Sequence, residues 1–194
     1  QLLKFQIPSP YHKPTENSAD FWVKPYLELF RLIRHFGSLK FDELMIFGLQ
    51  LVDFRQFSNI VTKIDQFRIA KAQNDGNYKR FRAEYLEAEL KELYSDDISS
   101  GNTRTRETND ASIAKFLKTK ASNMRDYADA CFRYLRATGL VNISHLGKSI
   151  SIVPEKIQEV DYFLEHADRE PCFVNNEGQY VAYLGNPLIP ALLT

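Results

Sequence analysis

Apolar residues recur every three or four positions along most of the chain, and this spacing places them on one face of a helix. Over residues 21–36, for example, Tyr26, Leu29, Phe30 and Ile33 follow it. The same pattern predicts a short helix that starts at residue 38 and longer helices over residues 53–72, 78–94, 113–138 and 155–166. The chain is therefore expected to be mainly α-helical.

A different pattern follows Gly139, which ends the predicted helix 113–138. Apolar and polar residues alternate over residues 141–144 and again over residues 149–152, as in a half-buried two-stranded ribbon. A helix followed at once by such a ribbon is the ending of a winged helix-turn-helix, a DNA-binding module. The predicted fold class is mainly α (α+β), of winged helix-turn-helix type, with several helices and a C-terminal two-stranded β wing.

The helix 113–138 is predicted to have two unlike faces. One face carries residues suited to the core, namely Met124, Tyr127, Ala128, Cys131 and Leu135. The opposite face is polar and largely basic, with Lys118, Ser122, Arg125, Asp129 and Arg136. Such a helix can pack against the protein on one side and present cations to a partner on the other.

Three regions follow from the spacing of these elements. Residues 1–97 are predicted to form an N-terminal strap and a helical, helix-turn-helix-like subdomain. Residues 98–111, which are almost without apolar side chains, are predicted to be a loop or linker. Residues 112–194 are predicted to form a winged-helix subdomain with a C-terminal turn region.

Charge and cysteine content restrict the partners and the location. The chain has 25 Lys and Arg against 25 Asp and Glu, so its formal net charge is zero and any DNA binding must come from a local patch. Cys131 and Cys172 are too few for a disulfide framework, which favours a reducing, cytoplasmic location. We expect no membrane span and no signal peptide. Because the chain begins with Gln1 instead of Met, we also expect it to be a piece of a longer protein.

A search for catalytic chemistry finds little. The histidines are scattered, no CxxC or HExxH spacing occurs, and the glycine-rich phosphate-binding motifs and the GxSxG motif are missing from the sequence. The only E-x-K tripeptide of the kind that nucleases use is Glu89-Leu90-Lys91, which lies in a stretch that favours helix. The sequence thus predicts no catalytic residue, no metal site and no cofactor in this chain.

Candidate DNA-binding residues are concentrated on the helix 113–138 and at the tip of the wing. Arginine, lysine and asparagine side chains bind phosphates, and arginine and asparagine also form bidentate contacts with base edges. The candidates are Lys118, Lys120, Asn123, Arg125, Arg133, Arg136 and, on the wing, Lys148. The alternative interpretation is that the arginines of this helix are neutralised by Asp126 and Asp129.

The same helix resembles a block of the AlwI-type type IIS restriction endonucleases and of the related large-subunit nicking endonucleases. The matching residues include Thr119-Lys120, Asn123, Arg125-Asp126, Ala128-Asp129-Ala130, Arg133-Tyr134, Arg136 and Thr138-Gly139-Leu140. Supporting matches are Lys4, Gln6, Pro8-Ser9, His12, Pro154-Glu155-Lys156, Gly185-Asn186-Pro187 and Pro190. The resemblance extends over roughly the whole chain.

The resemblance implies a division of labour. In that family, winged-helix subdomains read an asymmetric DNA site, and a separate C-terminal domain of PD-(D/E)xK type cuts nearby with Mg²⁺. This chain resembles the second half of the recognition region, so the family's catalytic carboxylates carry over to no residue here. Mg²⁺ is expected only for the parent nuclease, and a second nuclease subunit is a further partner that the family suggests.

The resulting hypothesis is a DNA-recognition fragment that binds double-stranded DNA as a monomer. Three alternatives stay open at this point. A winged-helix protein-interaction module predicts an apolar, salt-insensitive interface. A transcriptional regulator predicts a two-fold dimer on palindromic half-sites. A self-contained hydrolase predicts Mg²⁺-dependent nicking by this chain alone.

Overall fold

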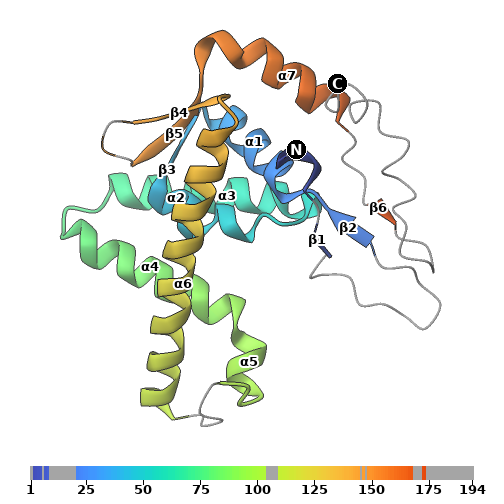
Figure 1. Ribbon diagram of the computed structural model, residues 1–194. Helices are drawn as coiled ribbons and strands as arrows, with labels where there is room; N and C mark the ends of the chain where they lie inside the picture. Colours follow the sequence, from blue (N-terminus) through green and yellow to red (C-terminus); the bar gives the residue numbers. More distant parts are fainter. Residues whose placement is uncertain are drawn as a thin grey trace.

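The computed structural model describes residues 2–5, 7–8, 21–103, 109–144, 146, 148–167 and 172–173. Within them the fold is mainly helical, as predicted, with two small antiparallel sheets (Figure 1). The helices are α1 Pro25–Phe36, α2 Phe41–Ile46, α3 Phe57–Ala72, α4 Tyr78–Leu93, α5 Ser95–Ser99, α6 Asp110–Ala137 and α7 Ile157–His166. The strands are β1 Ile7–Pro8, β2 Phe21–Val23, β3 Ser38–Lys40, β4 Val141–Ile143, β5 Ser149–Ile152 and β6 Cys172–Phe173.

Several boundaries differ from the sequence-based expectation. The first helix begins at Pro25, because proline suits the first turn of a helix, and residues 21–23 form strand β2 instead. Gly37, with φ of 72°, ends α1, and the chain continues as strand β3 where a helix was predicted. Helix α5 extends into the start of the stretch 98–111, which was predicted to be a loop. Most of the predicted N-terminal strap and the turn at residues 185–187 lie outside the described residues.

The two predicted strands of the ribbon are present, and a third strand pairs with them. Strands β4 and β5 form an antiparallel hairpin, called here the β4–β5 hairpin, and β3 adds to its other side to give the order β3-β5-β4. Leu39 pairs with Ile150 in this sheet, and both side chains are completely buried. The expectation of two strands was therefore wrong in number. An isolated two-stranded hairpin is marginally stable, so pairing with β3 anchors it to the core.

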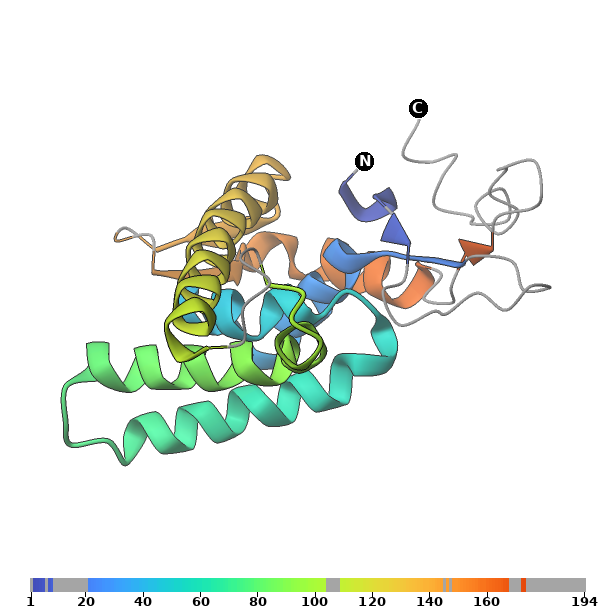
Figure 2. The same cartoon turned by 90° about the horizontal axis from the view of Figure 1, so that it is seen from below.

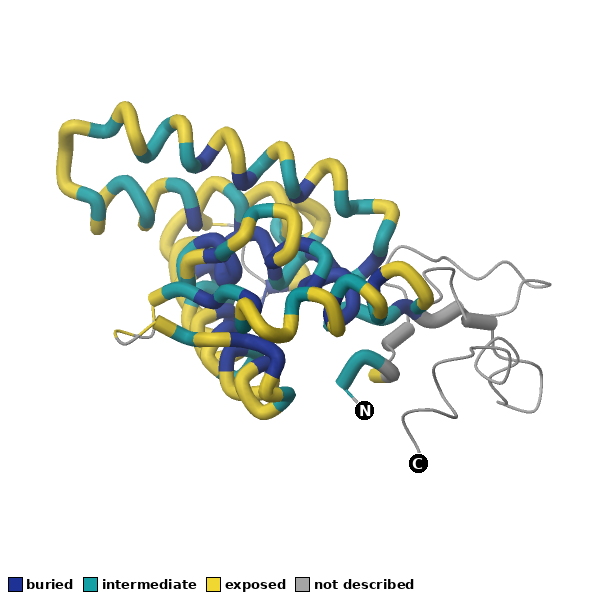
Figure 3. The backbone as a smooth tube through the Cα atoms, turned by 90° about the horizontal axis from the view of Figure 1, so that it is seen from above, coloured by how far each residue is buried: buried dark blue, intermediate teal, exposed yellow. Residues whose placement is uncertain are grey.

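One hydrophobic core is shared by the predicted regions 1–97 and 112–194. Phe30 from α1, Phe47 after α2 and Phe67 from α3 are buried in it together with Leu135 from α6 and Ile150 from β5. The buried segments gather where these elements cross, while much of the outer surface of α3 and α4 is exposed (Figure 3). In the sheet with the order β3-β5-β4, strand β3 comes from the predicted region 1–97, and strands β4 and β5 come from the predicted region 112–194. The division into subdomains at residues 98–111 stays a prediction.

Helices α3 and α4 form an antiparallel pair, called here the α3–α4 arm. The turn between them and the tip of the β4–β5 hairpin project toward the same side of the molecule (Figures 1 and 2). Asn77 is the N-cap of α4. Its side-chain oxygen accepts a hydrogen bond from the backbone N–H of Lys79 at 2.9 Å. The arm thus reaches out beside the hairpin.

Two carboxylates in the first turn of α2 hold the arm in place. Glu43, whose side chain is 3% exposed, accepts two hydrogen bonds of 2.8 Å from the guanidinium of Arg68 in α3. Asp42 accepts hydrogen bonds from the Tyr78 hydroxyl at 2.7 Å and from Arg82 at 3.0 Å, both in α4. Each helix of the arm is therefore attached to α2 by a charge-assisted hydrogen bond.

Replacement of Glu43 by alanine is expected to lower the free energy of unfolding by about 3 kcal/mol, because it leaves the partly buried Arg68 guanidinium without its partner. Urea unfolding followed by circular dichroism measures this loss. Glu84→Ala is the matched control, since the Arg80–Glu84 pair is exposed at 82% and 62% and should contribute little to stability. Equal losses in the two variants would contradict the structural role of Glu43.

Candidate nucleic-acid interface

Helix α6 is the longest helix described and carries six of the seven predicted DNA-binding residues. Its first turn is capped by Asn109, whose side chain accepts a hydrogen bond from the N–H of Ser112 at 2.9 Å. Its C-terminal end is set by Gly139, with φ of 70°. The face that packs on the core carries Leu117, Met124, Ala128, Phe132 and Leu135.

The predicted apolar face of α6 is correct for Met124, Ala128 and Leu135, and Cys131 is partly buried beside them. Tyr127 was wrongly assigned to the core, since it is 63% exposed. Residues three apart on a helix differ by about 60° in direction, so Tyr127 lies beyond the edge of the buried stripe that Met124 and Ala128 define.

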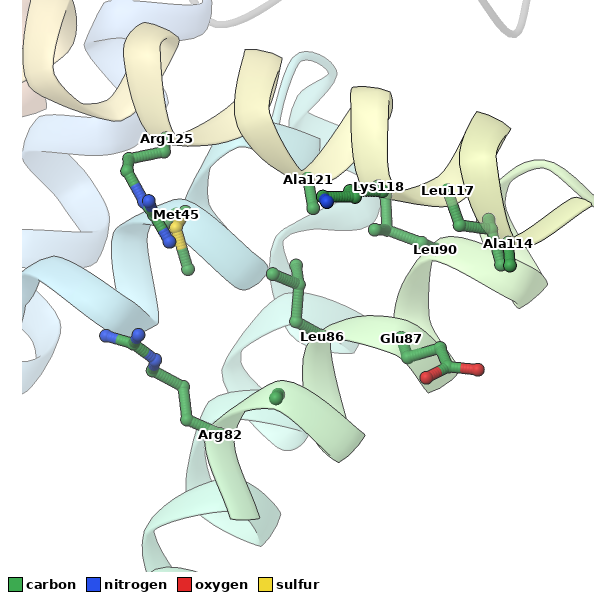
Figure 4. A pocket seen from close by; sticks show the side chains of 11 residues that line it. Met45, Arg82, Leu86, Glu87, Leu90, Ala114, Leu117, Lys118, Ala121 and Arg125 are labelled. Atoms are coloured by element: carbon green, nitrogen blue, oxygen red, sulfur yellow. The ribbon is translucent and has the colours of Figure 1, made fainter. Parts of the chain in front are cut away.

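The predicted site residues lie on two flanks of α6. Lys118 and Arg125 line a cavity between α6 and α4, called here the α6–α4 cavity, together with Arg82. Arg125 and Arg82 approach this cavity from opposite helices, on either side of Met45 (Figure 4). Arg136 is three turns beyond Arg125 on the same flank and is exposed.

The other flank holds Lys120 and Asn123, which line a separate hollow with Tyr94 and Tyr127. The Lys120 amine lies 4.3 Å from the centroid of the Tyr94 ring and 5.1 Å from that of Phe116. These are cation–π distances, so Lys120 also stabilises the contact between α6 and the end of α4. The structure therefore does not bring all the predicted residues to one face.

The expected neutralisation of the α6 arginines by aspartates is small. Arg133 lies 3.6 Å from Asp129, and both side chains are mostly exposed, at 72% and 63%. Such an exposed pair contributes little energy and leaves the guanidinium accessible. Within the described part of the chain, Arg125 and Arg136 form no ion pair, and neither does Asp126.

Lys148 lies at the tip of the β4–β5 hairpin and is exposed. The backbone N–H groups of Lys148 and Ser149 both donate to the hydroxyl oxygen of Ser144 at 3.2 Å. The carbonyl of Lys148 accepts from the N–H of Phe41 at 2.9 Å, which connects the hairpin to the start of α2. The backbone at Lys148 is thus held in place while its side chain extends into solvent.

Ion pairing divides the described cations into two groups. The arginines of α1 and most cations of the arm are paired with carboxylates, as in Arg34–Asp161, Lys63–Glu89 and Lys91–Glu87. The described cations without such a partner include Lys40, Lys71, Lys79, Lys115, Lys118, Lys120, Arg125, Arg136 and Lys148. Seven of these nine lie on α6 or at the hairpin sheet, and Lys71 and Lys79 lie on the arm. A chain with zero net charge thus carries most of these unpaired cations on α6 and the hairpin sheet.

A second set of contacts fixes α6 against α1. The Tyr26 hydroxyl is hydrogen-bonded to Cys131, and the Tyr26 ring meets Tyr134 edge-on with centroids 6.4 Å apart. Burial, followed by the neighbouring Cys131, raises the pKa of Tyr26 to about 12. Burial also raises the pKa of the Cys131 thiol. These shifts show that the contact between α1 and α6 is partly shielded from water.

The nuclease-like tripeptide Glu89-Leu90-Lys91 lies on helix α4. The Glu89 carboxylate accepts from Lys63 at 2.8 Å and from Gln50 at 3.3 Å, while Lys91 is bound to Glu87 at 2.7 Å. Among the residues that the structure describes, no group of three or more His, Cys, Asp or Glu side chains is arranged to hold a metal ion. The described residues do not fit the Mg²⁺ site that a restriction nuclease requires.

Unpaired cations that lie close together attract polyanions such as nucleic acids. The chain belongs to the AlwI restriction endonuclease family, whose family model matches residues 1–189, and this confirms the resemblance seen in the sequence. Restriction endonucleases act on DNA, so the family implies DNA as a partner. No curated protein gives a significant match. No helix in the described part of the chain is long and apolar enough to cross a membrane.

The raised pKa of Tyr26 gives a pH-dependent stability with a definite sign. Unfolded tyrosine ionises near pH 10, whereas folded Tyr26 stays neutral up to about pH 12. The stabilisation is therefore complete below pH 10 and is lost as pH rises toward 12. In Tyr26→Phe, thermal unfolding temperatures should fall less steeply between pH 10 and pH 11.5 than in the unmodified protein.

Tyr127→Phe is the control for this measurement, because Tyr127 is largely exposed. Its unfolding temperature should follow the same pH dependence as that of the unmodified protein. An identical pH dependence in all three proteins would show that Tyr26 is not shielded by α6.

Proposed function

We propose that this chain is the DNA-recognition part of a type IIS restriction or nicking endonuclease, and that it binds duplex DNA as a monomer through α6 and the β4–β5 hairpin. The observation that carries the proposal is the concentration of unpaired cations on these elements in a neutral member of the AlwI family. A neutral protein needs such a local concentration to attract the phosphate backbone.

We assign the winged helix-turn-helix to α1, β3, α2, α6, β4 and β5, in this chain order. Helix α2 packs against α6, with Phe41 and Phe132 in edge-to-face contact at 5.4 Å. The hairpin follows α6 directly, and β3 lies between α1 and α2 on the outer side of β5. In this assignment α6 is the recognition helix, the hairpin is the wing, and α3 to α5 are an insertion before the recognition helix.

The two flanks of α6 fit this role. The major groove is about 12 Å wide, close to the diameter of a helix with its side chains, so a helix in the groove faces a phosphate strand on either side. Lys118, Arg125 and Arg136 would contact one strand from one flank, and Lys120 and Asn123 the other strand from the opposite flank. Arg133 lies on the outer surface between these flanks, where it would reach base edges, and Lys148 would contact the backbone from the wing.

Cleavage is proposed to belong to another region of the parent enzyme. Glu89 and Lys91 form the only E-x-K tripeptide of the chain, and Glu89 is paired with Lys63 of α3 while Lys91 is paired with Glu87 of its own helix. The Mg²⁺ that the family requires would then be bound outside this recognition part. Incubation of the protein with supercoiled DNA and Mg²⁺ is expected to leave the DNA intact, and nicking by the pure chain would contradict this division.

Fluorescence anisotropy on random-sequence duplexes tests the binding proposal directly. Five cationic phosphate contacts, from Lys118, Lys120, Arg125, Arg136 and Lys148, predict that the logarithm of the association constant falls with the logarithm of salt concentration with a slope of about −4.5. A protein-interaction module would show no such binding, and a dimeric regulator would bind two copies per site. Absence of salt-dependent binding at low ionic strength would overturn the proposal.

Arg125→Ala and Arg133→Ala are each expected to weaken binding. Arg125→Ala should reduce the magnitude of the salt slope by about 0.9, because Arg125 is assigned to a phosphate, whereas Arg133→Ala should change the slope less, because Arg133 is assigned to base edges. Lys156→Ala removes one cation at the start of α7, where Lys156 is bound to Glu159 away from α6, and should leave the slope unchanged. If both arginine variants bind like the unmodified protein, this surface of α6 is not the DNA-binding surface.

A further inference from the structure

A second cavity adjoins the proposed interface, between the arm and the hairpin. It is lined by side chains from four separate segments: Lys40, Asp42, Lys71, Tyr78, Arg82 and Lys148. This arm cavity shares Arg82 with the α6–α4 cavity, so the two are adjacent along α4. It involves none of the cations predicted on α6.

The arm cavity carries an excess of positive charge. Four cations face one carboxylate, Asp42, so the net charge of its lining is 4 − 1 = +3. Asp42 is bound to Arg82, which leaves Lys40, Lys71 and Lys148 without a carboxylate partner among the described residues. Three lysines that converge from positions so far apart in the sequence repel one another, and a bound anion relieves that repulsion.

The fixed geometry of the arm keeps these lysines together. Tyr78 and Arg82 are attached to Asp42 in α2, and the amine of Lys71 lies 4.5 Å from the centroid of the Tyr78 ring. Lys40 is the residue before α2, and its backbone N–H donates to Glu43 at 2.8 Å. Little ordering of the backbone is therefore needed when an anion binds, which favours affinity.

We propose that the arm cavity binds the sugar–phosphate backbone of the same DNA duplex, so that the α3–α4 arm and the hairpin hold DNA together. This inference rests on the proposed function. A polyanion fits better than a single phosphate, because Arg82 connects the arm cavity with the α6–α4 cavity and successive phosphates of one strand can occupy both. The arm and the hairpin also point to the same side of the molecule (Figures 1 and 2).

The test is the salt dependence of duplex binding in the Lys40→Gln/Lys71→Gln double variant. Loss of two phosphate contacts is expected to reduce the magnitude of the slope by about 1.8. Lys71→Arg, which keeps both the charge and the contact with Tyr78, should retain the slope of the unmodified protein. Arg80→Gln removes a cation from the same arm outside both cavities and should also retain it.

The outcomes separate this inference from the proposed function. If Arg125→Ala weakens binding but the double variant binds like the unmodified protein, the arm cavity does not contact DNA and the proposed function stands. If Arg80→Gln lowers the magnitude of the slope as much per charge as the double variant does, general electrostatics and not the cavity is responsible, and the inference is overturned. If the unmodified protein shows no salt-dependent binding to duplex DNA, the proposed function and this inference fail together. Equal thermal unfolding temperatures in all variants exclude an effect of misfolding.

Discussion

The attachment of the α3–α4 arm to the first turn of α2 is the interaction on which the arrangement of the charged surface depends. Asp42 and Glu43 are adjacent in sequence, and each binds a different helix of the arm. Glu43 is buried, so its charge is tolerated only because Arg68 and the N–H of Lys40 both donate to it. Two carboxylates thus determine where the cations of the arm lie relative to α6 and the hairpin.

The paired and unpaired cations serve different purposes. Pairs such as Arg34–Asp161 between α7 and α1 connect elements of the fold and are neutral overall. The unpaired lysines and arginines of α6, the hairpin sheet and the arm form no ion pair with a described carboxylate, although Lys71 and Lys120 pack on the rings of Tyr78 and Tyr94. Like charges among them repel one another most at low salt. Neutralisation by DNA, as proposed above, would remove this repulsion.

The sequence predicted the elements with a regular pattern and missed those defined by distant contacts. The α6 helix, the two strands of the hairpin and helix α3 were predicted from spacing alone. Strand β3 was missed because Ser38–Lys40 contains one apolar residue, Leu39, and no alternation can be recognised in three residues. The clustering of Lys40 with Lys71 and Lys148 depends on tertiary packing, so no local pattern contains it. The candidates on α6 lie on more than one side of the helix because they were chosen by residue type as well as by helical position.

The position of β3 has a consequence for folding. Leu39 pairs with Ile150, so the sheet that anchors the hairpin closes only when residues 111 positions apart meet. During synthesis α1, β3, α2 and the whole arm leave the ribosome before β5 exists, and the edge of β3 stays unpaired for that time. The hairpin itself forms quickly from neighbouring residues, but its docking needs a long-range loop closure. We therefore expect that sheet formation is the slow step of folding, and that the arm cavity, which needs Lys148 in place, is completed last.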